Sequence, residues 1–170
     1  MSFVTSGGLP LDPIAEARRL WVEHGWEHAA DGMAAVTSLM RAHQIALARV
    51  ESVLRPFGVT FARYEVLMLL YFSRKGTLPM ALIGARLQVH PTSVTNAVDR
   101  LEAAGLVRRT PHAADRRSTV VVLLDEGREL AESATAALNT EVFGALGIPA
   151  GDMTSLVHVL TEMRHNAGDF

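Results

Sequence analysis

The feature that most constrains the fold is a change of hydrophobic period within residues 79–124. Residues 79–87 and 91–104 are two short stretches with helical spacing. Gly105 follows the second stretch and suits the end of a helix. Residues 106–110 and 119–124 are instead rich in β-branched and apolar side chains, and the segment between them is polar. This pattern predicts a β-hairpin whose loop is longer than a tight turn. Two short helices followed by a hairpin predict a winged helix-turn-helix.

Helical patterns flank this segment on both sides. The Asp-Pro pair at residues 12–13 suits the N-cap and first position of a helix that ends near Gly25. A longer amphipathic helix follows and ends before residues 55–58, RPFG. Two more helices follow the hairpin, one that starts at Asp125 and one that starts after Pro149.

The helix before the winged segment is expected to be the buried centre of the fold. Thr60 can cap it, and residues 64–72, YEVLMLLYF, place apolar side chains on nearly every side. Arg74, Lys75 and Gly76 are expected to close it with positive charge and a glycine.

Composition favours a mostly α fold with a small β-hairpin, which is an α+β class. The 170 residues are 49% hydrophobic, so a core can form. Only 6% are aromatic while Ala and Leu are frequent, which favours helices over a β-sandwich.

Charge and cysteine content exclude several functions. The absence of cysteine excludes disulfides, thiolate metal sites and cysteine-based peroxide sensing. No stretch reaches the roughly 18 apolar residues of a membrane span, and residues 1–13 lack the features of a signal peptide. We therefore expect a cytoplasmic protein with no membrane partner.

The net charge of −2 is unevenly distributed, because residues 86–117 carry +3 and residues 123–170 carry −6. Such a basic island can bind a polyanion.

The second short helix, PTSVTNAVDRLEAA, separates apolar from polar side chains. Val94, Val98 and Leu101 share one face and are expected to pack inward. The other faces carry short polar groups, and no acid in the first turn repels a phosphate. Asparagine can pair with adenine, and arginine can reach a phosphate or a guanine. We therefore predict DNA contacts from Thr92, Ser93, Thr95, Asn96 and Arg100.

The loop of the hairpin supplies a second predicted DNA contact. Arg116 and Arg117 lie near its tip, where arginine suits the negative potential of a narrow minor groove. Asp115 could orient the Arg117 guanidinium. Arg108 and Arg109 on the first strand are expected to touch phosphates or to pair with acids.

Residues 90–109, HPTSVTNAVDRLEAAGLVRR, and residues 114–130, ADRRSTVVVLLDEGREL, resemble the MarR family of winged-helix regulators. The resemblance covers roughly residues 33–165. It implies an obligate homodimer whose N- and C-terminal helices interlock, with each reading helix and wing on one half-site of a pseudo-palindromic double-stranded DNA operator. It also implies that Arg117 of the acid-x-Arg motif enters the minor groove with Asp115 as its partner.

This resemblance divides the chain into four segments. They are a flexible tail (1–11), N-terminal dimerisation helices (12–58), a winged helix-turn-helix DNA-binding domain (59–124) and C-terminal dimerisation helices (125–170).

The extra helix before residue 30, with Trp21 and Trp26, resembles the subgroup of this family that responds to urate and other organic anions. Members commonly bind a small aromatic or anionic ligand between the dimerisation helices and the winged domain. Trp21 could stack on a flat ligand and Arg63 could pair with an anion. In the alternative interpretation, Trp21 anchors the added helix and Arg63 pairs with Glu65 or a neighbouring acid.

Pairs of histidines at helical spacing can bind a metal ion. His24 and His28 are four residues apart, as are His158 and Glu162, with His165 three further on. No cysteine or third ligand joins either pair. We therefore expect surface histidines, no metal and no resident cofactor.

The leading hypothesis is a sequence-specific, ligand-responsive transcriptional regulator, a repressor that a small aromatic or anionic effector releases from DNA. The alternatives are a metal-sensing regulator and a helical adaptor that binds protein through a winged helix without DNA. An enzyme is not expected, since the sequence has no glycine-rich phosphate loop, nucleophile elbow or metal triad.

Overall fold

The structure is a computed structural model that describes residues 9–111 and 118–170. It divides into two compact units, residues 1–49 and 50–170, which are described separately. The predicted wing-tip residues Asp115, Arg116 and Arg117 lie outside the described residues. The division into four functional segments remains a prediction.

The first unit is built from α1 (Pro13–Glu23) and the beginning of α2 (Glu27–Leu54). As the sequence predicts, Asp12 caps α1, and its carboxylate accepts a hydrogen bond from the backbone N–H of Ile14 at 2.9 Å. Gly25 adopts a positive φ of 80° in the turn between the two helices, a conformation that glycine adopts without steric cost.

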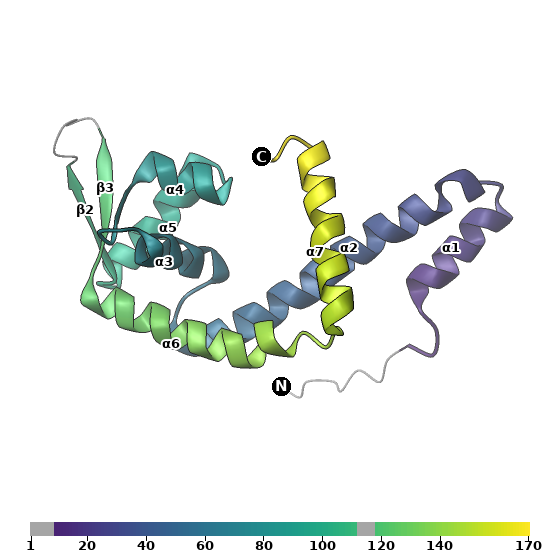
Figure 1. The fold of residues 1–170 in the computed structure, drawn as a ribbon, viewed down its shortest axis with the longest axis horizontal. Helices are drawn as coiled ribbons and strands as arrows, with labels where there is room; N and C mark the ends of the chain where they lie inside the picture. Colours follow the sequence, from purple (N-terminus) through teal and green to yellow (C-terminus); the bar gives the residue numbers. More distant parts are fainter. Residues whose placement is uncertain (1–8, 112–117) are drawn as a thin grey trace. The chain divides into compact units, whose positions relative to one another are not determined.

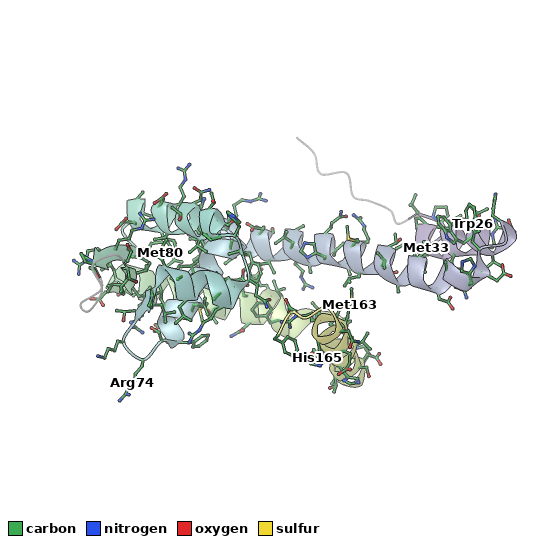
Figure 2. All side chains as sticks on the ribbon, turned by 90° about the horizontal axis from the view of Figure 1, so that it is seen from above. Trp26, Met33, Arg74, Met80, Met163 and His165 are labelled. Atoms are coloured by element: carbon green, nitrogen blue, oxygen red, sulfur yellow. The ribbon has the colours of Figure 1, made fainter. Side chains whose placement is uncertain are left out.

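Contacts across this turn hold α1 against the start of α2. Trp21 and Trp26 meet edge to face with ring centroids 5.3 Å apart, and Trp26 lies at this end of α2 in Figure 2. Arg18 pairs with Asp31 at 2.6 Å, and Ala30 is buried beneath. Trp21 therefore packs against the turn into α2, and the Arg18–Asp31 pair joins the two helices.

The second unit contains the end of α2 and all later elements, and Figure 1 shows its helices and hairpin. These elements are η1 (Arg55–Phe57), α3 (Phe61–Phe72), β1 (Thr77–Pro79), α4 (Met80–Leu87), α5 (Pro91–Ala103), β2 (Val107–Pro111), β3 (Thr119–Leu123), α6 (Asp125–Glu141), η2 (Phe143–Ala145) and α7 (Ala150–Asn166).

Helix α3 is the centre of the core, as its apolar sequence predicts. It packs against α4, α5, α6 and β3, and Tyr64, Val66, Leu67 and Leu70 are buried. Leu70 is the last buried residue of α3, and Phe72 at its end is 74% exposed.

The ends of α3 differ from the expectation. Thr60 occupies the N-cap position but makes no side-chain cap; the Glu51 carboxylate instead accepts the Phe61 N–H at 2.8 Å. Ser73 is the C-cap of α3, and its hydroxyl donates to the Leu70 carbonyl at 2.7 Å. Gly76 therefore does not cap α3 but lies in the turn into β1.

The described residues form a three-stranded antiparallel sheet in the order β1-β3-β2. The predicted hairpin is confirmed, but β1 was missed, and the helix expected from Pro79 begins at Met80. Three residues are too few to show a strand period, and proline is tolerated because β1 is an edge strand. Val121 of β3, opposite Leu78 and Arg109, is fully buried.

The predicted mostly helical fold with a small β-hairpin is thus confirmed. In the part of the chain that the structure describes, no single helix is long and apolar enough to cross a membrane. Residues 125–145 and 150–166 reach the length and apolar composition of a membrane span only when taken together, and the chain bends by 101° between them.

Candidate nucleic-acid interface

The helix-turn-helix consists of α4 and α5 joined by a tight turn. Gln88 ends α4 in the left-handed conformation with φ 53°, and its N–H donates to the Gly84 carbonyl. A Cβ at Gly84 would lie 3.4 Å from a methyl group of Val94, so the small residue lets the two helices approach closely. The turn thereby sets the position of α5 against α4.

The first turn of α5 is held by local hydrogen bonds. His90 is its N-cap, with Nδ1 accepting the Thr92 N–H at 3.3 Å, and Pro91 follows as the first helical residue. The Thr95 hydroxyl donates to the Pro91 carbonyl at 3.0 Å. Its oxygen can still accept a hydrogen bond from a ligand.

The faces of α5 are divided as the sequence predicts. Val94, Val98 and Leu101 are buried in the core. The predicted contact residues are all exposed, and they are Thr92, Ser93, Thr95, Asn96 and Arg100. Within the described part of the chain, the side chains of Ser93, Asn96 and Arg100 make no hydrogen bond or ion pair. These groups are available to a ligand, and their DNA contacts remain predictions.

Arg109 ties the hairpin to α5, a role left open between phosphates and acids. Its guanidinium donates to Asp99, to Glu102 at 3.0 Å and to the Thr95 carbonyl at 3.3 Å. Its backbone N–H donates to the other Glu102 oxygen at 2.7 Å. The acids three residues apart on α5 were the signal that could have predicted this anchor. The neighbouring Arg108 is exposed and makes no ion pair with a described residue.

Arg109→Ala is expected to lower the free energy of unfolding by about 1 to 2 kcal/mol, since a half-buried forked pair is lost while the backbone bond to Glu102 stays. Urea unfolding followed by circular dichroism measures this. Arg108→Ala removes the same charge from the same strand and is expected to change stability by less than about 0.5 kcal/mol. Equal losses for the two variants would show that Arg109 is not an anchor.

Arg63, predicted to meet an effector, lies in a groove beside α5. The groove measures about 680 Å³ and is lined by Thr60 and Arg63 from the start of α3 and by Ser93, Asn96, Asp99 and Arg100 from α5. Arg63 thus lies beside predicted DNA contacts, and its effector role with Trp21 stays a prediction.

The alternative pairing of Arg63 with Glu65 is not present in the described residues. Glu65 is half-buried on α3, and burial raises the pKa of its carboxyl above the ordinary value. Arg63 itself makes no ion pair with a described residue, so its guanidinium is available to a ligand.

The histidine pairs considered for metal binding do not assemble with further ligands. Within residues 9–111 and 118–170, no three His, Asp or Glu side chains gather where they could hold a metal ion.

Comparison with known proteins now identifies the family. The profile of the MarR family matches residues 57–118. The HTH-type transcriptional regulator YhbI of Bacillus subtilis strain 168 is 30% identical over 128 residues, which cover 69% of this chain and 82% of that protein. The chain belongs to the MarR family. It is therefore a helix-turn-helix transcriptional regulator, which agrees with the expectation that it is not an enzyme.

Solved MarR-family structures match the same fold. Sco5413 of Streptomyces coelicolor is 48% identical with a TM-score of 0.76, covering 82% of this chain and 97% of that one. The transcriptional repressor CouR, bound to a 23-mer DNA duplex, is 25% identical with a TM-score of 0.69, covering 74% and 89%. CouR of Rhodococcus jostii RHA1 bound to p-coumaroyl-CoA is 26% identical with a TM-score of 0.63, covering 74% and 87%.

Proposed function

We propose that this chain is a homodimeric repressor that binds a pseudo-palindromic DNA operator and leaves it when a small aromatic or anionic effector binds. The observation that carries the proposal is the reading helix α5. Its apolar face is buried, and its exposed faces present Ser93, Asn96 and Arg100, which have no partner among the described side chains and backbone groups. Short polar side chains and arginine on an exposed helix suit base edges and phosphates.

Exposed apolar side chains support the homodimer. In the first unit, the side chains of Val36 and Met40 on α2 are 58% and 62% exposed. In the second unit, α7 buries no residue and exposes Val157, Val159 and Met163. Apolar residues gathered on a helix usually mark an interface, and a second copy of the chain covers these helices in the proposed dimer.

The likeness to CouR supports both the repressor role and the effector. CouR is a repressor whose structure has been solved both bound to DNA and bound to p-coumaroyl-CoA, an aromatic and anionic CoA thioester. For release, the effector must bind the DNA-incompetent state more tightly than the DNA-bound state, because equal affinity shifts nothing. Trp21, which the sequence predicts to stack on a flat ligand, is the proposed effector contact.

Selection of bound fragments from the source genome tests this function. We expect the wild-type protein to enrich a pseudo-palindromic site, with affinity falling steeply as salt rises. Repeating the selection with urate, salicylate or an aromatic acyl-CoA identifies the effector by loss of the enriched fragments.

Asn96→Ala provides the specificity control for this selection. Loss of a bidentate contact to adenine is expected to relax the preference at one position of each half-site, at a cost of about 1 to 3 kcal/mol. No enriched site, or binding that is insensitive to salt, would favour the protein-binding adaptor instead.

A further inference from the structure

The groove between the start of α3 and α5 contains two arginines from different helices. Arg63 comes from the first turn of α3, and Arg100 from the middle of α5. In the described residues neither guanidinium makes a hydrogen bond or ion pair. Arg63 is half-buried, so part of its hydration is already lost before any ligand binds.

Asp99 is the acid that lines this groove, and its charge is partly compensated. Its carboxylate pairs with Arg109, which approaches α5 from β2. Arg109 is shared with Glu102, so Arg63, Arg100 and Arg109 face two acids and the groups at the groove keep a net charge of +1. A groove of this charge favours an oxyanion over a neutral or cationic ligand.

The position of the groove indicates which oxyanion it receives. Ser93 and Asn96, the predicted base contacts, line the same groove as the two arginines. A helix that reads base edges in a major groove about 12 Å wide necessarily has sugar-phosphate strands along both of its sides. Side chains that flank such a helix therefore meet phosphates when its own side chains meet bases.

We propose that Arg63 binds a backbone phosphate of the operator, together with Arg100, and is not part of the effector pocket. The proposal rests on the proposed DNA-binding function and adds a contact from outside the helix-turn-helix. Arg63 then acts as a clamp that fixes the angle at which α5 enters the duplex. It contributes affinity without reading sequence.

The test compares Arg63→Gln with the wild-type protein on the selected operator and on an unrelated duplex, over a series of salt concentrations. Two phosphate contacts are lost per dimer, so the slope of log K against log salt is expected to become shallower by about 2. Affinity is expected to fall about tenfold on both duplexes near 50 mM salt, since each phosphate contact is independent of sequence.

Two control variants separate this role from a general loss of charge or fold. Arg63→Lys keeps the charge and is expected to keep most of the slope. Arg74→Gln removes one positive charge from the exposed turn after α3, where Arg74 projects into solvent (Figure 2), and is expected to leave the slope unchanged. Circular dichroism of each variant checks that the fold is intact.

A soluble anion is the competing source of the same chemistry. A titration of the protein–operator complex with benzoate distinguishes a soluble anion from a DNA phosphate as the partner of Arg63. If Arg63→Gln keeps the wild-type salt slope but no longer responds to benzoate, Arg63 is an effector residue and the proposal is wrong. If the wild type binds the operator normally and Arg63→Gln has the same slope of log K against log salt, only the phosphate contact of Arg63 is wrong. Failure of the wild type to bind any duplex overturns the proposed function as well.

Discussion

Gly127→Ala is expected to lower the free energy of unfolding by about 3 kcal/mol, a large part of the stability of a domain of this size. Gly127 lies in the first turn of α6, where a Cβ would be 2.1 Å from the Leu106 carbonyl oxygen and 2.9 Å from a methyl group of Leu123. The carbonyl belongs to the backbone and also accepts the Leu124 N–H at 3.1 Å, so it cannot move aside cheaply.

This result would oppose intrinsic helix propensity, which favours alanine over glycine by about 1 kcal/mol. Gly151→Ala in α7 is the matched control, since nothing lies within 4 Å of its Cβ position. That variant is expected to be as stable as the wild type or slightly more stable. Urea unfolding followed by circular dichroism measures both. A Gly127→Ala protein with unchanged stability would show that α6 does not pack against residue 106.

Arg117→Ala is expected to reduce operator affinity about 100-fold, because a dimer loses two arginine contacts worth about 1 to 3 kcal/mol each. Arg117 lies outside the described residues, and this prediction rests on its place in the acid-x-Arg motif of the predicted wing. Fluorescence anisotropy with a labelled operator measures the loss, and sedimentation shows whether the variant is still a dimer.

Lys75→Ala is the matched control for Arg117→Ala. It also removes one positive charge, but from the turn before β1, and Thr77 of β1 pairs with Val122 at the end of β3 away from the hairpin loop. Its effect on operator affinity is expected to be less than threefold. Equal losses for the two variants would show that net charge, not the wing, controls binding.

The parts of the fold that depend on long periodic segments could be predicted from the sequence. The order of helices, the burial of α3 and the two faces of α5 all follow from the spacing of apolar residues. Strand β1 could not be found this way, since its three residues show no period and depend on pairing with β3, more than 40 positions away. Glu51 was missed as the cap of α3 because it belongs to the preceding helix.

The candidate site was predictable to the same extent. The exposed residues of α5 were named from its own helical pattern, but the contact of Arg63 with their groove depends on how α3 packs against α5. The sequence predicts that Arg63 and Trp21 share an effector because both suit an aromatic anion, and this stays a prediction. Packing places Arg63 beside Asn96 and Arg100, and the chemistry of the residue alone cannot distinguish an effector contact from a phosphate contact.

The anchor made by Arg109 has a consequence for how such a regulator can be switched. Since one guanidinium joins β2 to three positions along α5, tilting the reading helix would drag the hairpin with it. Each winged unit then behaves as one lever. An inducer therefore gains little by distorting a single winged unit. In the proposed dimer it acts by changing the distance between the two reading helices until that distance no longer matches one turn of the double helix.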